Sequence, residues 1–137
     1  MFFETLIITI LGTALSYQDI SQRKVNTYIL SIYVLAIIVF YRFENICILP
    51  SIIFLAIGIV YYVVKKKQAF GFADYILILV HSLLIKNSMW ELFIICIGIY
   101  GIIFGVIFRK YQNIPFIPVI FLATITINFI KHIFTWN

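Results

Sequence analysis

The chain has 137 residues, of which 64% are hydrophobic and 11% are charged, and its mean hydropathy is +1.13. So few charged residues cannot cover the surface of a soluble domain of this size, and we therefore expect an integral membrane protein. The net charge is +5, but the lysines and arginines lie in short clusters between apolar runs, which is typical of membrane-protein loops and not of a nucleic-acid-binding surface.

Six apolar segments are close to the length of about 20 residues that a helix needs to cross a bilayer. In chain order they cover approximately 2–18, 27–42, 46–64, 70–86, 89–108 and 114–134. Each must be a helix if it crosses lipid, because open sheet edges cannot be satisfied there. No linker interrupts the series. The sequence thus predicts an all-α polytopic membrane protein, with six transmembrane helices in one bundle and a single domain over 1–137.

The charges of the connections predict the orientation in the membrane. The first, third and fifth connections hold seven basic residues: Arg23, Lys24, Lys65, Lys66, Lys67, Arg109 and Lys110. The opposite side holds three basic residues, Arg42, Lys86 and Lys131, together with Glu4, Glu44 and Glu91. Since basic loops stay in the cytoplasm, we expect the odd connections inside, both termini outside, and a multi-pass location in the cell membrane.

The only two aspartates of the chain fall at the same predicted membrane depth. Asp19 is at the cytoplasmic end of the first segment, and Asp74 is in the first turns of the fourth. If these segments are neighbours, the two carboxyl groups can share a water, one ionised as general base and one protonated as hydrogen-bond donor. This is aspartyl protease chemistry, for which we expect no metal and no cofactor. Gly71 fits such a site, because a residue without Cβ permits close approach.

Structural pairing is the competing interpretation of the same two residues. Asp19 is four positions before Arg23, the spacing of an ion pair on one helix face. Asp74 could pair with one of the three preceding lysines. The residues alone leave both interpretations open.

At these positions the sequence resembles the type IV prepilin peptidase family, including its preflagellin peptidase branch. The first aspartate of the family begins a segment similar to D-x-x-x-x-x-[IV]-[PS]-N, and this chain reads DISQRKVNT from Asp19, with Arg23 and Val25 in matching positions. The second aspartate ends a GxGD motif, which here reads Gly71-Phe72-Ala73-Asp74. A P-F-x-P start of the last helix is matched by Pro115-Phe116-Ile117-Pro118.

The resemblance implies an aspartyl endopeptidase that removes the short basic leader of a prepilin or pseudopilin at the cytoplasmic membrane face. It implies Asp19 and Asp74 as the catalytic pair; the residues that bind substrate or shape the site are then Gly71, Ala73, Arg23, Pro115 and Pro118. The partners would be the leader peptide with its hydrophobic helix and the lipid bilayer. The paired CxxC motifs of larger members do not occur here, so we expect cleavage without N-methylation.

The motifs differ from the family pattern in three places. Ala73 stands at the second glycine of GxGD, Ile76 stands where a lysine is frequent, and Asn26-Thr27 replaces Pro-Asn or Ser-Asn. Two other functions stay open. One is a presenilin-type intramembrane protease, although its P-A-L motif does not occur in this sequence. The other is a non-enzymatic ion carrier or assembly subunit.

Three further features have structural interpretations. His81, two helical turns after Asp74, is expected to pack between helices. The glycines Gly98, Gly101 and Gly105 favour close helix contact, either within the bundle or in a homo-oligomer. The two cysteines, Cys47 and Cys96, are expected to be small apolar fillers in helices.

Overall fold

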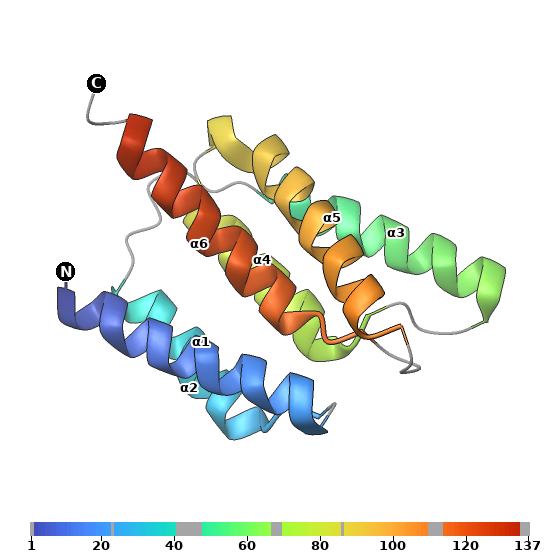
Figure 1. Ribbon diagram of the computed structural model, residues 1–137, viewed down its shortest axis with the longest axis horizontal. Helices are drawn as coiled ribbons and strands as arrows, with labels where there is room; N and C mark the ends of the chain where they lie inside the picture. Colours follow the sequence, from blue (N-terminus) through green and yellow to red (C-terminus); the bar gives the residue numbers. More distant parts are fainter. Residues whose placement is uncertain are drawn as a thin grey trace.

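The computed structural model describes residues 2–22, 24–40, 48–66, 70–85, 87–109 and 114–134. These residues form six α-helices and one 3-10 turn, with no strand among them (Figure 1). The helices are α1 (Phe2–Gln22), α2 (Thr27–Phe40), α3 (Leu49–Lys65), α4 (Phe72–Leu84), α5 (Trp90–Ile107) and α6 (Ile117–Phe134), and the turn η1 (Asn87–Met89) precedes α5. The all-α prediction is therefore confirmed, with one helix for each predicted apolar segment.

One described helix, α5, is long and apolar enough to cross a membrane when helices are judged by length and composition alone. The helices α2, α3 and α4 are apolar but shorter, with 14, 17 and 13 residues. These lengths alone do not establish six transmembrane helices with both termini outside.

The connection between α1 and α2 is fixed by side-chain hydrogen bonds. Asn26 caps α2, because its Oδ1 accepts the N–H of Tyr28 at 2.9 Å. The N–H of Asn26 in turn donates to Oε1 of Gln18 at 3.1 Å. The helix α1 continues to Gln22, four residues beyond the predicted end of the apolar segment. Asp19 is therefore inside the last turns of α1.

Helix α6 is the centre of the bundle, since it packs against α1, α4 and α5 (Figure 1). The helix pairs α1 with α2, α3 with α4, and α2 with α4 complete the main contacts. Val119, Ile120 and Ala123 of α6 are fully buried, as are Leu15 of α1 and Phe93 of α5. Through α6, the first helix of the chain is joined to α4 and α5.

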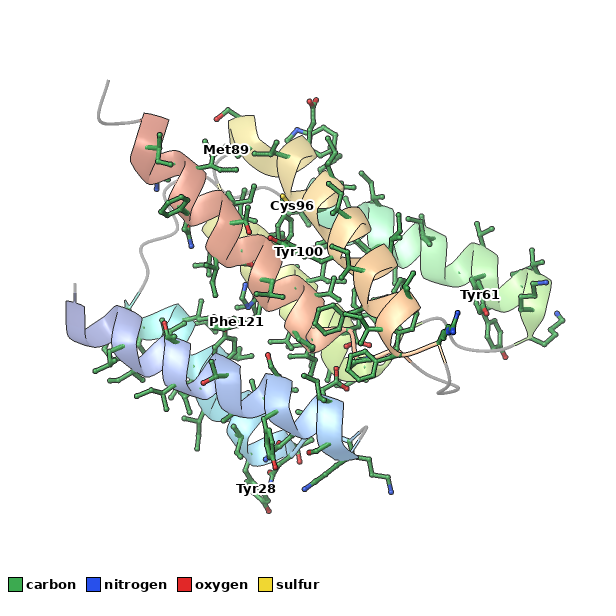
Figure 2. The ribbon with its side chains drawn as sticks, in the orientation of Figure 1. Tyr28, Tyr61, Met89, Cys96, Tyr100 and Phe121 are labelled. Carbon is green, nitrogen blue, oxygen red and sulfur yellow. The ribbon has the colours of Figure 1, made fainter. Side chains whose placement is uncertain are left out.

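The outer surface of the bundle is apolar. On α5, the exposed side chains of Ile95, Ile99, Ile102 and Val106 recur at intervals of three or four residues. Figure 2 shows such side chains projecting outward from α3 and α5. Exposed apolar stripes of this kind are typical of surfaces that contact other proteins or a membrane.

The glycines of α5 do not make the contact that their spacing favours within the described part of the bundle. A Cβ added at Gly98 or Gly101 would meet no atom within 4 Å, and one added at Gly105 would meet Ile114. Cys96, on the same helix, is buried as predicted, whereas Cys47 is outside the described residues. Close helix approach occurs instead at a glycine of α1.

Gly12 of α1 makes room for a side chain of α6, because a Cβ there would overlap the ring of Phe121. Figure 2 shows Phe121 between these two helices. The absence of a side chain at Gly12 therefore determines the spacing between α1 and α6.

We expect Gly12→Ala to destabilise the protein by roughly 1–3 kcal/mol, because the new methyl group forces the Phe121 ring or the helices apart. The matched control is Gly101→Ala on α5, which enters open space and is expected to be neutral or stabilising by up to about 1 kcal/mol. Thermal unfolding in detergent micelles measures both. Equal unfolding temperatures for the two variants would contradict the close approach.

Candidate active site

Asp74 belongs to the first turn of α4 and is held by its own helix start. Gly71 is the N-cap residue, and its N–H donates to Oδ2 of Asp74 at 2.7 Å. The N–H of Asp74 donates back to the carbonyl oxygen of Gly71 at 3.1 Å. The bond from Gly71 to the carboxylate is the half of a capping box that the third helical residue supplies, and the positive end of the helix dipole favours a carboxylate at this position.

Asp19 is bonded to the start of α6. Its Oδ2 accepts the backbone N–H of Ile117 at 3.0 Å. The first N–H groups of a helix have no partner within the helix, and the next residue, Pro118, has no N–H at all. The carboxylate of α1 therefore caps a helix that is almost a hundred residues further along the chain.

The structure brings the two predicted aspartates together at one end of the bundle. Both side chains are partly buried. Asp19 is bonded to Ile117, and Phe116 beside it packs on Phe70, which precedes Gly71 and the start of α4. α1 and α4 are joined mainly through α2 and α6, each of which packs against both. The start of α6 is thus the element that positions one carboxylate near the other.

Among the described residues, an ion pair with a lysine or arginine does not explain the position of Asp74. Lys65 and Lys66 are exposed, and within the described ranges no lysine or arginine forms an ion pair with Asp74. Arg23, the candidate partner of Asp19, is outside the described residues, as is Lys67. The role of Arg23 in the site stays a prediction.

The backbone of the Gly71–Asp74 segment is compatible with the alanine at position 73. Ala73 is helical and partly buried against the core, and among the described residues only Lys66 has a positive φ outside glycine. Gly71 has φ −74° and ψ 162°, which any residue can adopt. A Cβ at Gly71 would lie 3.4 Å from Oδ2 of Asp74, so this glycine leaves space beside the carboxylate.

An aromatic cluster that the sequence analysis did not identify joins the two motif segments. The rings of Phe70 and Phe116 have centroids 4.8 Å apart, and Phe54 of α3 is within 5.7 Å and 6.1 Å of them, respectively. Phe70 precedes Gly71, and Phe116 precedes Ile117. Pro115 and Pro118 are both buried beside this cluster. The sequence shows Phe70 just before the Gly71–Asp74 motif and Phe116 inside the proline motif, but the spacing of residues does not show that these two rings are in contact.

A buried polar network two turns deeper fixes three helices together. Nε2 of His81 is 2.8 Å from the hydroxyl of Tyr33, and Nδ1 is 2.6 Å from Oγ1 of Thr124. The Thr124 hydroxyl donates to the carbonyl oxygen of Ile120 at 3.0 Å. It therefore accepts from Nδ1–H, and Nε2 accepts from Tyr33. His81 packs between helices, as predicted, and its partners are on α2 and α6.

A small cavity of about 10 Å³ lies beside this network, among side chains that include Leu15, Tyr33, His81 and Ile117. One water molecule needs roughly 10–15 Å³ of such space. This cavity is therefore too small to admit a peptide.

Comparison of the chain with protein-family models, with curated proteins and with solved structures finds no match. The resemblance to prepilin peptidases therefore depends on the motifs around Asp19, Asp74 and Pro115.

We expect Thr124→Val to lower the free energy of unfolding by about 1–3 kcal/mol, because it leaves a buried imidazole N–H without an acceptor. Thr126→Val is the matched control on α6, since Thr126 bonds the partly buried hydroxyl of Tyr100 at 2.8 Å. Such exposed or partly exposed bonds contribute about 0.6 kcal/mol on average in membrane helices. Denaturant titration in micelles compares the two, and an equal loss in both variants would argue against the inferred network.

Proposed function

We propose that this protein is a membrane aspartyl endopeptidase that removes the short basic leader of prepilin-like substrates at the cytoplasmic membrane face. The observation that carries the proposal is that Asp19 and Asp74 lie at the same end of the bundle, where the start of α6 is bonded to Asp19 and packs, through Phe116, on Phe70 next to the start of α4. They come from distant helices, and each is oriented by a backbone N–H. The motif resemblance supplies the substrate class.

The arrangement of the helices supports a six-span topology. In Figure 1, α1 begins and α6 ends at the left, while the ends of α1, α3 and α5 point to the opposite side. The basic residues Lys24, Lys65, Lys66 and Arg109 follow those three helix ends. We assign this basic end to the cytoplasm, which puts both termini outside and the two aspartates at the cytoplasmic face.

The chemistry requires one ionised and one protonated carboxyl group. The ionised carboxylate takes a proton from a water molecule, and the water oxygen attacks the carbon of the scissile peptide bond. The protonated carboxyl donates a hydrogen bond to the carbonyl oxygen. The C–N bond then breaks as the leaving nitrogen receives a proton, so that water is consumed and two peptides are released. Close carboxyl groups favour this singly protonated pair.

The substrate would approach from the end of the bundle. The cavity beside His81 has room for no more than a water molecule, and the aspartates are in the outermost turns of α1 and α4. The apolar helix of the substrate would stay in the bilayer while its leader reaches the carboxylates in an extended form.

A structural role for the same aspartates is the second candidate function, because each one caps a helix. In that case the protein would be a non-enzymatic membrane subunit. Asparagine substitutions distinguish the two, since an amide oxygen still accepts the N–H of Gly71 or Ile117 but cannot act as a base.

We expect Asp19→Asn and Asp74→Asn each to lower the cleavage rate at least about 100-fold while the unfolding temperature changes little. The measurement is the mobility shift of a prepilin-like substrate co-expressed with each variant, and mass spectrometry of the product should find an unmethylated amino terminus. Glu91→Gln, an exposed carboxylate at the opposite end of the bundle, is the matched control and should cleave at the parent rate. Cleavage by both asparagine variants at the parent rate would exclude the mechanism.

We expect Ala73→Gly to leave the cleavage rate nearly unchanged and to lower stability by roughly 1 kcal/mol, because position 73 is helical and glycine is a poor helix former. Parallel cleavage and unfolding measurements on the parent and the variant check this. A large gain in activity would mean that the helical conformation at Ala73 is not the active one.

A further inference from the structure

A groove on the outside of the bundle runs along the seam between α3 and α4. It has a volume of about 380 Å³, within the range of about 300–1,000 Å³ of ligand pockets. The lining residues are Leu55, Gly58, Ile59 and Tyr62 from α3, and Phe70, Phe72 and Tyr75 from the segment that begins α4. The walls are therefore apolar, apart from two tyrosine hydroxyl groups.

The shape of the groove follows from a missing side chain and an inward-turned ring. Gly58 has no Cβ at the point where the Tyr75 hydroxyl approaches α3. Phe70 is turned toward the core, with its ring edge-on to Tyr75 at 5.8 Å. Phe72 and Tyr62 are exposed at the rim. The groove thus opens to the surroundings of the bundle and not to its interior.

Two exposed lysines follow the last groove residue of α3. Leu55, Ile59 and Tyr62 are spaced so that they share one face of α3, and Lys65 and Lys66 come within about one helical turn after Tyr62. Lys66 ends the helix in a left-handed conformation, with φ 56°, and its N–H donates to the carbonyl oxygen of Tyr62 at 2.8 Å. Lys65 and Lys66 are exposed, and no described acidic residue forms an ion pair with either.

We propose that this groove binds an anionic phospholipid. An acyl chain would occupy the apolar part beside Leu55 and Ile59, the Tyr62 hydroxyl would face the ester region, and the phosphate would meet Lys65 and Lys66. Along α3, apolar residues are thus followed by a tyrosine and then by lysines, which is the order of chemical groups along such a lipid. The inference needs a membrane around the helices but does not depend on peptidase activity.

The charge at the end of the groove distinguishes this occupant from two others. A substrate with a basic leader would bring positive charge toward Lys65 and Lys66, which repels it. A second copy of the chain, related by symmetry, would bring its own lysines to the same place. An anionic headgroup is the occupant that these two side chains attract.

The experiment measures lipid binding to the purified full-length chain by native mass spectrometry, with phosphatidylglycerol and phosphatidylcholine as probes. We expect phosphatidylglycerol to bind more tightly, by about fivefold for each lysine. The double variant Lys65→Gln, Lys66→Gln should lose this preference, whereas Lys24→Gln, an exposed lysine elsewhere at the same end, should keep it.

A second pair of variants tests the groove itself. Ile59→Trp fills it and should abolish phosphatidylglycerol binding, whereas Ile99→Trp, at an equally exposed position on α5, should not. If Ile59→Trp does not fold, the lysine variant still decides the question. Asp19→Asn with Asp74→Asn should bind lipid normally, which separates this proposal from the peptidase.

Three results would overturn the proposal: equal binding of the two lipids by the parent, equal binding by the two tryptophan variants, or a preference that survives loss of both lysines. Displacement of phosphatidylglycerol by a helical peptide with a basic leader would identify the groove as a substrate site instead. A dimer that Ile59→Trp dissociates would identify it as a contact between two copies.

Discussion

The hydrogen bond from the N–H of Ile117 to Asp19 is the interaction on which the arrangement of the site depends. Ile117 is buried, so water does not satisfy its N–H, and an unpaired N–H is costly to bury. Here the partner is a carboxylate on another helix. By bonding to it, α6 draws the end of α1 to its own start, and Phe116 then packs on Phe70 next to Gly71 and Asp74. The capping of one helix therefore assembles both motif segments.

Helix capping by Asp19 and Asp74 is compatible with the catalytic role that we propose for the same two side chains. A carboxylate has about four acceptor positions, so one backbone N–H does not exhaust its capacity to bind water or a proton. The backbone bonds at Oδ2 of Asp19 and Asp74 limit the orientations of the two groups. Groups held in place before the reaction need less reorganisation during it. Capping and catalysis make compatible demands, and the asparagine variants separate them because they remove only the proton chemistry.

The sequence was sufficient for the six helices, because apolar runs are local signals. The common membrane depth of the two aspartates stays a prediction. The sequence was not sufficient for the contacts between helices. On α5 apolar residues face every direction, so periodicity does not identify a packing face, and the spaced glycines Gly98 and Gly101 lie next to open space. The glycines that permit close approach are the isolated Gly12 and Gly58. Their partners, Phe121 and Tyr75, belong to other helices, and nothing in the spacing of residues along the chain encodes such pairs.

Helix α4 has 13 residues and lies between the aspartate site on one side and the outer groove on the other. Its rotation about its own axis must therefore be fixed. The network of Tyr33, His81 and Thr124 fixes it, because the imidazole is bonded on both sides to neighbouring helices. Asp74 is seven residues before His81 and therefore on the same face, which directs it toward α1 and α6. Tyr75, one position on, is then directed toward α3 and the outer groove. A change in this rotation would move the carboxylate and the groove wall together, so the buried histidine has a structural effect on both without touching either.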